Sequence, residues 1–197
     1  MKILSFVDTH NSEIAFKKVL HLANAEKPDV IISAGDITIF GASLDFLVQQ
    51  INKFHVPALF VHGNHESEGN MRDACALFKH TIFIHKKLYD LNEFLCIGFG
   101  GGGFSNKDRE FEMFIQKKHE HISGKKIILV THAPPYGTKL DQISRSYSGN
   151  KSFTMFIKKY QPELVICGHI HENRGREDCM GRTRIINPGP FGKIIDI

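Results

Sequence analysis

One pattern recurs along the chain: a short apolar segment ends, and a side chain that can bind a metal follows at once. The five occurrences are Asp8-Thr9-His10, Gly35-Asp36, Gly63-Asn64-His65-Glu66, Thr131-His132 and Gly168-His169-Ile170-His171. In open α/β sheets the carboxyl ends of parallel strands meet at one edge, where ligands bind. Glycines in three of the groups let the backbone turn sharply. The pattern therefore predicts an α/β fold with one polar cluster at a sheet edge.

The chemistry of these side chains indicates which metals the cluster would bind. Carboxylate, imidazole and amide oxygen together suit divalent Mn, Fe, Ni, Co or Zn. The lack of a thiolate among them argues against a structural zinc cage. Each group alone is also typical of a turn or a helix cap. Their joint occurrence in one chain, each at a strand end, predicts a metal site.

Apolar periodicity predicts strands and helices that alternate over much of the chain. Helices are expected over residues 12–25, 43–54, 69–79, 108–121 and 151–160. Strands are expected over residues 2–7, 30–33, 57–62, 82–85, 94–98, 126–131 and 164–167, with short strands between 182 and 197. The apolar faces of the first two helices are expected to be Ile14, Val19 and Leu22, and Leu44, Leu47, Val48 and Ile51. With 197 residues and no repeat or linker, we expect one domain, residues 1–197.

Composition excludes several classes of protein. The hydrophobic fraction is 42%, and no apolar run approaches the roughly 18 residues of a membrane span. The first residues are patterned as a strand and not as a signal peptide, so we expect a cytoplasmic protein without membrane contact. The four cysteines have no CxxC spacing. Cys96 and Cys167 lie in apolar segments and are expected to be buried thiols.

The net charge of +4 suits an anionic substrate, but the lysines are spread along the chain. This distribution argues against a nucleic-acid partner. The chain also has twelve histidines. Outside the five groups, His62 is expected in or beside the core, and the remainder at the surface or in loops: His21, His55, His80, His85, His119 and His121. Glu66 is expected in the first turn of a helix, where the dipole favours an acid.

Taken together, the segments DTH, GD, GNHE, THAPP and GHIH, followed by INPGP, resemble the calcineurin-like metallophosphoesterases, in particular small single-domain members. The resemblance spans the chain from Asp8 to Pro190. It implies a four-layer αββα sandwich, in which two mixed β-sheets are flanked by helices. It also implies a metal-dependent phosphoric ester hydrolase with two divalent metal ions.

The resemblance also gives eight side chains a role. The implied metal ligands are Asp8, His10 and His171 for one ion, Asn64, His132 and His169 for the other, and Asp36 as the bridge. His65 would be the catalytic acid or a phosphate-binding group. The implied reaction is in-line attack of a hydroxide between the metals on a small phosphodiester or phosphomonoester. Nucleotides are among the candidate substrates, and Mn is the first metal to test in vitro.

One position departs from the family pattern. Protein phosphatases and many cyclic nucleotide phosphodiesterases carry an acid three residues after the bridging Asp, and here Ile39 stands in that place. This argues against a protein phosphatase and leaves His65 without its expected partner. A catalytically weak scaffold or binding module on the same fold, as in a retromer subunit, and a nuclease are the alternatives. The complete ligand set argues against the scaffold, and the lack of a basic groove or capping domain argues against the nuclease.

Two further segments have open interpretations. Gly100 to Gly103 form either a loop over the substrate or a bend between elements. Residues 136–150 follow His132 and are rich in Gly, Ser and Arg. In that segment, Arg145 and Asn150 are candidates for substrate contact.

Overall fold

The computed structural model describes residues 1–197 and contains two large sheets. The strands of the five-stranded sheet lie in the order β13 (Lys193–Asp196), β1 (Lys2–Phe6), β2 (Val30–Ser33), β3 (Ala58–Phe60) and β4 (Thr81–Phe83). Those of the six-stranded sheet lie in the order β11 (Glu177–Met180), β12 (Thr183–Ile186), β10 (Leu164–Ile166), β7 (Lys126–Thr131), β6 (Phe94–Phe99) and β5 (Lys87–Leu91). Both sheets are mixed, because β13, β11 and β5 pair antiparallel at the edges while the other pairs are parallel.

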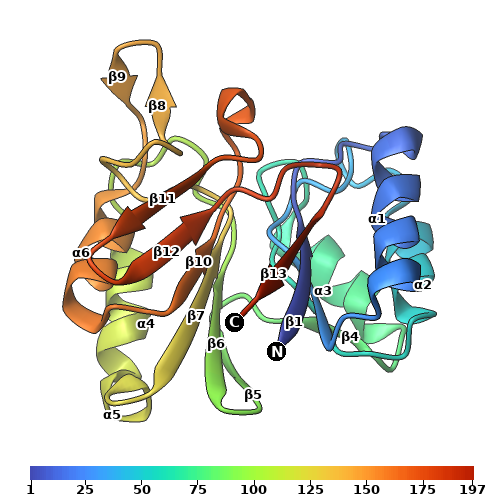
Figure 1. The fold of residues 1–197 in the computed structure, drawn as a ribbon, viewed down its shortest axis with the longest axis horizontal. Helices are drawn as coiled ribbons and strands as arrows, with labels where there is room; N and C mark the ends of the chain where they lie inside the picture. Colours follow the sequence, from blue (N-terminus) through green and yellow to red (C-terminus); the bar gives the residue numbers. More distant parts are fainter.

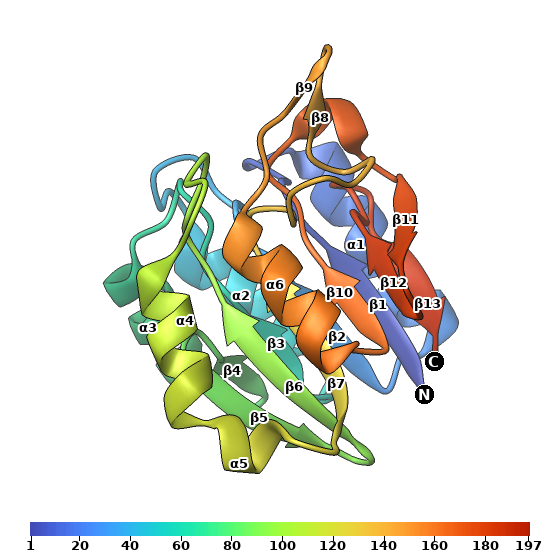
Figure 2. The same ribbon diagram turned by 90° about the vertical axis from the view of Figure 1, so that its left-hand side faces the viewer.

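Helices cover the outer face of each sheet (Figures 1 and 2). On the five-stranded sheet they are α1 (Glu13–Glu26), α2 (Leu44–Asn52) and α3 (Glu68–Ala76). On the six-stranded sheet they are α4 (Arg109–Lys117), α5 (His119–Ile122) and α6 (Lys151–Tyr160). The four layers are therefore helix, sheet, sheet, helix. This arrangement confirms the expected αββα sandwich.

Three apolar cores lie between the four layers. In β2, Val30 and Ile32 pack against the opposite sheet, while Ile31 between them packs against α1–α3. Successive side chains of a strand point to opposite faces, so a strand buried on both faces is expected to be apolar along most of its length. This is why the inner strands read as continuous apolar runs in the sequence.

The expected helices form, with ends shifted by a few residues. The predicted helix 108–121 divides at Lys118 into α4 and α5. All four residues of the expected apolar face of α2 are buried. The expected face of α1 is right at Val19 and Leu22, which pack in the core, and wrong at Ile14, which is 78% exposed. The buried stripe runs through Ala15, Val19 and Ala23, since residues at i, i+4 and i+8 share one face of a helix.

Some elements are absent from the sequence prediction. They are the edge strands β5 and β11, the hairpin formed by β8 (Gln142–Ile143) and β9 (Ser146–Tyr147), and a 3₁₀ turn at His171–Asn173. The hairpin projects beyond the end of the six-stranded sheet (Figure 1). The edge strands are partly exposed and carry charged residues, so no apolar run marks them.

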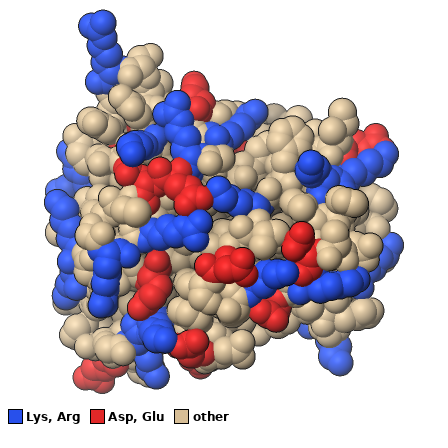
Figure 3. Space-filling model, in the orientation of Figure 1, with Lys and Arg blue, Asp and Glu red and all other residues tan.

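The distribution of surface charge and the burial of two cysteines agree with the sequence predictions. Lys and Arg are interspersed with Asp and Glu over the face shown in Figure 3, with no continuous basic patch on it. Cys96 and Cys167 are buried free thiols, as expected, and Cys75 is buried as well. None of the helices has the length and apolar character that a membrane crossing requires.

The amino group of Met1 donates a hydrogen bond to the carbonyl of Ile197 at 2.6 Å, next to the β1–β13 pair.

Candidate metal centre

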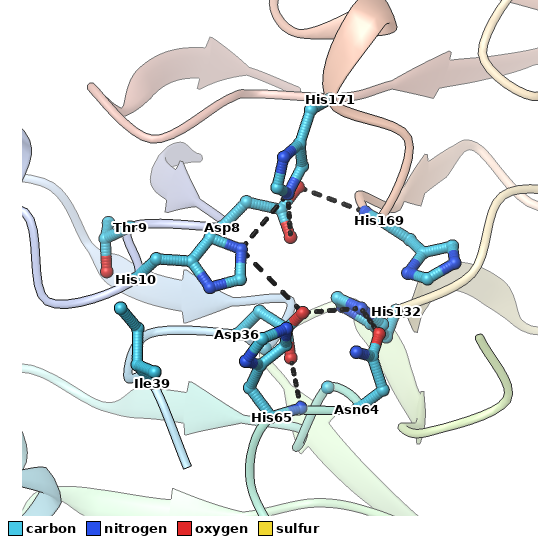
Figure 4. Close-up of polar contacts among 12 residues, drawn as sticks. Asp8, Thr9, His10, Asp36, Ile39, Asn64, His65, His132, His169 and His171 are labelled. Atoms are coloured by element: carbon cyan, nitrogen blue, oxygen red, sulfur yellow. Dashed lines mark hydrogen bonds and ion pairs between the residues drawn. The ribbon is translucent and has the colours of Figure 1, made fainter. Parts of the chain in front are cut away.

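The eight predicted site residues lie together where strands of both sheets end (Figure 4). They follow β1 (Asp8, His10), β2 (Asp36), β3 (Asn64, His65), β7 (His132) and β10 (His169, His171). The parallel pairing of these strands places their carboxyl ends at one edge of each sheet, as the sequence pattern predicts. The structure thus brings together every residue that the sequence singles out for this site.

The strand ends approach each other so closely that some positions require glycine. A Cβ atom at Gly63 would lie 1.9 Å from Oδ1 of Asp36, and one at Gly168 would lie 2.2 Å from the side chain of Val7. The backbone is also strained at Asp8, Asp36 and His169, where φ is 55°, 51° and 68°. Left-handed backbone at residues other than glycine costs about 1–3 kcal/mol each and concentrates at functional sites.

Asp8, His10 and His171 form the first of the groups whose donor atoms lie within 4.8 Å of one another. The two Nε2 atoms of His10 and His171 face each other at 3.1 Å. Nε2 of His171 is 3.9 Å from Oδ1 of Asp8. That oxygen is buried without a hydrogen-bond partner, while the other oxygen of Asp8 accepts a bond from the backbone of His169 at 3.0 Å. A buried carboxylate oxygen without a partner is costly unless a cation is bound to it.

Asp36, His132 and His169 form a second group, with Asn64 beside it. Nδ1 of His132 donates to the carbonyl of Ala34 at 3.0 Å, so Nε2 is the atom that faces the cluster. This Nε2 lies 3.1 Å from Oδ1 of Asn64 and 3.3 Å from Oδ2 of Asp36. Nε2 of His169 is buried and has no partner. The convergence of these atoms requires a positive charge between them, from a proton or a metal ion.

Asp36 lies between the two groups. The same Oδ2 that faces His132 is 3.9 Å from Nε2 of His10, a member of the first group. Its other oxygen accepts a hydrogen bond from the backbone of His65 at 2.8 Å. A third group of donor atoms joins His10, Asp36 and His65. Asp36 therefore has the central position that a bridging ligand would need.

The two carboxylates of the site have opposite pKa shifts. Burial raises the pKa of Asp8 to about 6. Burial also acts to raise the pKa of Asp36, but the hydrogen bond and charge of His132 outweigh it and lower that pKa to about 2. In turn, burial acts to lower the pKa of His132, and Asp36 holds it above its usual value. Asp36 and His132 thus favour each other's charged form, and Nε2 of His132 faces Oδ2 of Asp36 at 3.3 Å, where a metal could bind.

Burial favours the neutral form of the imidazoles of His10, His169 and His171. Burial lowers the pKa of His169 to about 4 and also lowers the pKa of His10 and His171. A metal ion binds the neutral form of histidine, so these side chains would lose no proton on binding. Unpaired buried donors, neutral imidazoles and buried carboxylates together fit divalent cations.

Glu66 is not in the helical turn where the sequence predicts it. It lies outside a helix, because Ser67 caps α3 and the helix begins at Glu68. Its buried carboxylate accepts hydrogen bonds from the backbone of Asp36, Thr38 and Gly63 at 2.9, 2.7 and 3.2 Å, and from the hydroxyl of Thr38 at 2.8 Å. Glu66 thus fixes the turn that carries Asp36, and this contact spans about 30 residues of sequence.

His65 lies beside the first group without an acidic partner at position 39. Its ring centroid is 4.6 Å from that of His10, and its Nδ1 is buried without a hydrogen-bond partner. Ile39 is 47% exposed and offers no group that could orient the imidazole. The structure therefore agrees with the departure seen in the sequence.

The glycine segment is a loop fixed against His62 and His85, and the prediction for His85 is wrong. His85, expected at the surface or in a loop, is only 6% exposed. Burial lowers its pKa to about 3, and its Nδ1 accepts the N–H of Gly100 at 2.8 Å. Its ring lies 4.6 Å from that of His62, which is half-buried.

The two candidates for substrate contact in residues 136–150 have different positions. Asn150 is fully buried and caps α6, a structural role, whereas Arg145 is exposed in the hairpin turn.

Comparisons with known proteins identify the family. Residues 1–173 match the calcineurin-like phosphoesterase family. An uncharacterized protein of Methanocaldococcus jannaschii, MJ1162, is 29% identical over 96% of this chain and 88% of its own length. A probable glycerophosphodiester phosphodiesterase of Arcobacter nitrofigilis, GpdQ, is 24% identical over 84% of this chain and 64% of its own. The crystal structure of the protein TT1561 of Thermus thermophilus superposes with a TM-score of 0.79 at 16% identity, covering 96% of this chain and 89% of that one. The chain therefore belongs to the calcineurin-like phosphoesterase family and is a metal-dependent phosphoric ester hydrolase.

Proposed function

We propose that this protein binds two divalent metal ions and hydrolyses a small phosphodiester or phosphomonoester. The supporting observation is the convergence of unpaired buried donor atoms, Oδ1 of Asp8 and Nε2 of His169, on either side of the carboxylate of Asp36. A scaffold would not need this arrangement. The name of the similar protein from Arcobacter nitrofigilis favours a phosphodiester among the possible substrates.

The proposed ligand sets follow the two groups of side chains. They are Asp8, His10 and His171 for one ion, Asn64, His132 and His169 for the other, and Asp36 shared by both. Mn, Fe, Ni, Co and Zn suit this mixture of oxygen and nitrogen donors. When bound, the ions would supply Lewis-acid charge for the phosphate oxygens and lower the pKa of a coordinated water towards about 7.

The surrounding residues would orient the substrate and move a proton. His65 is placed beside His10 and Asp36, where it can bind a phosphate oxygen or donate a proton to the leaving alkoxide. Glu66 would keep the turn of Asp36 in place during the reaction. We further propose that residues 1–197 act as one domain, and the cytoplasmic location stays a prediction from the sequence.

Removal and replacement of the metals test this function. Protein stripped with a chelator should be inactive towards bis(p-nitrophenyl) phosphate and p-nitrophenyl phosphate, and should regain activity with two equivalents of Mn. Asp36→Asn should lower that activity by roughly 100-fold or more and bind fewer than two ions, because the shared carboxylate is gone. Glu120→Gln, which alters an exposed acid on α5, is the matched control and should bind two. Full activity without metal, or two ions bound to Asp36→Asn, would contradict the proposal.

A further inference from the structure

Two exposed phenylalanine side chains lie against the candidate metal centre. Phe40, in the loop between β2 and α2, is 83% exposed, and Phe104, in the loop between β6 and α4, is 65% exposed. The ring of Phe40 is 5.2 Å from that of His65, and the ring of Phe104 is 4.4 Å from that of His169. Each ring thus contacts an imidazole of the site while most of its own surface faces solvent.

The two rings contact different groups of the centre. His65 belongs with His10 and Asp36, whereas His169 belongs with Asp36 and His132. Phe40 comes from a loop of the five-stranded sheet, and Phe104 comes from a loop of the six-stranded sheet. A phosphate held by metal ions beside the shared Asp36 would therefore have an aromatic side chain near it from each sheet.

The loop of Phe40 is fixed by hydrogen bonds on both sides of the residue. The N–H of Ile39 donates to the side chain of Asn11, and the N–H of Gly41 donates to the hydroxyl of Thr38 at 3.0 Å. Phe40 itself has φ of 52°, a left-handed conformation that a bulky residue rarely adopts. The chain thus holds this aromatic residue, at a cost, in an exposed position next to His65.

The loop of Phe104 is fixed as well. The N–H of Gly101 donates to the carbonyl of His62 at 2.9 Å, and a Cβ atom on Gly103 would lie 3.8 Å from the ring of His169. On the other side of Phe104, the side chain of the buried Asn150 donates to the carbonyl of Ser105 at 2.9 Å. The glycine segment therefore places Phe104 over the site.

We propose that Phe40 and Phe104 determine specificity, and that the substrate is a phosphodiester whose organic part carries a flat aromatic group, a nucleobase or an aryl ring. This inference rests on the proposed function of the same site. An aromatic group stacked on either ring would remove apolar surface from water and gain the attraction of an aromatic pair. A polar aliphatic ester would leave both rings exposed to water and would gain neither.

Esters with one leaving group and different second groups test this proposal. Bis(p-nitrophenyl) phosphate, thymidine 5′-(p-nitrophenyl) phosphate and methyl p-nitrophenyl phosphate all release p-nitrophenol, and the methyl ester lacks a second aromatic group. The double variant Phe40→Ala/Phe104→Ala should lower the kcat/KM of an aromatic ester relative to the methyl ester by about 2- to 12-fold, mainly through KM. The intrinsic reactivity of each ester cancels when the variant is compared with the wild type.

Matched controls separate a specificity role from a structural one. Phe46→Ala removes another exposed ring, 59% exposed on α2. It should leave unchanged the ratio of kcat/KM for an aromatic ester to kcat/KM for the methyl ester. Phe40→Tyr/Phe104→Tyr keeps both rings and should retain the ratio, and all variants should bind two equivalents of Mn. If the double variant lowers the relative kcat/KM of the thymidine ester, the substrate's aromatic group is a nucleobase. If only the relative kcat/KM of the bis ester falls, it is a small aryl group.

The outcomes distinguish this inference from the function on which it rests. An active wild type, with a double variant whose ratio stays within about 2-fold of the wild-type value, would overturn the inference alone. The same holds if the double variant loses activity equally on all three esters. A wild type that binds two metals and cleaves none of the esters would overturn the proposed function and the inference with it.

Discussion

At the scale of single residues, Asp8 shows how the site is destabilised without a cation. Its side chain is buried, one carboxylate oxygen has no partner, and burial raises its pKa to about 6. Because the folded-state pKa lies above the unfolded value, the protonated form stabilises the fold. This contribution is complete below about pH 4 and is lost as the pH rises through about 6. At neutral pH the metal-free protein therefore contains an unfavourable charge.

Asp8→Asn should remove that charge while it keeps the shape of the side chain. In chelator near pH 7.5, we expect the free energy of unfolding to rise by about 1–3 kcal/mol relative to the wild type, and near pH 4.5 the difference should be smaller. Urea unfolding at both pH values, followed by circular dichroism, measures this. The same variant should bind Mn more weakly. A less stable Asp8→Asn at pH 7.5 would mean that the buried carboxylate is stabilised by contacts that the amide cannot make.

The candidate site is largely visible in the sequence because its chemistry is local. Asp8, Asp36 and His169 each lie within three residues of the end of an apolar strand, and the sheet topology then brings the strand ends together. Glu66 and His85 are missed for the opposite reason. Their roles depend on backbone groups about 30 and 15 residues away, and no spacing in the sequence marks those partners.

At the scale of elements, burial determines how well a strand can be predicted from the sequence. Inner strands such as β2 (VIIS) and β7 (KIILVT) are apolar along most of their length, since helices cover one face and the second sheet covers the other. The strand β11, Glu-Asp-Cys-Met, pairs with only one neighbour and is half in water. Backbone pairing with β12 holds it in the sheet. Its side chains give little sequence signal for a strand.

The glycine loop after β6 gives a prediction at this scale. A Cβ atom on Gly100 would lie 2.4 Å from the carbonyl oxygen of His62, so Gly100→Ala must displace the loop that carries Phe104. We expect a loss of about 1–3 kcal/mol in unfolding free energy. Gly69→Ala in α3 is the matched control. Its Cβ would have no contact shorter than 3.6 Å, so it should be neutral or stabilise the helix. Equal effects of the two substitutions on urea unfolding would contradict this packing.

At the scale of the whole molecule, the candidate centre joins the two sheets. Asp8 and Asp36 come from the five-stranded sheet, and His132, His169 and His171 come from the six-stranded one. A metal held by both sets would favour the packed arrangement over any state in which the sheets separate. Metal binding should therefore be linked to global stability and not only to the order of a loop.

Thermal unfolding in Mn and in chelator tests this linkage. At a free Mn concentration 100 times its dissociation constant, each site should stabilise the fold by about 2.7 kcal/mol, which raises Tm by several degrees. Asp36→Asn should show a smaller shift, because it lacks the shared ligand. A Tm that is the same in Mn and chelator, at a concentration where the wild type binds two ions, would show that the sheets do not depend on the centre.

The contact between Met1 and Ile197 has a consequence for how the chain can be rearranged. Residues 1 and 197 are hydrogen-bonded neighbours, at the opposite end of the sheets from the metal centre, while the β8–β9 turn projects into solvent (Figure 1). A short Gly-Ser linker could join the two ends, and new ends could be opened between Ser144 and Arg145. We expect such a circular permutant to fold and bind Mn as the parent does. The order in which the strands are synthesised would then change, with every pairing in both large sheets preserved.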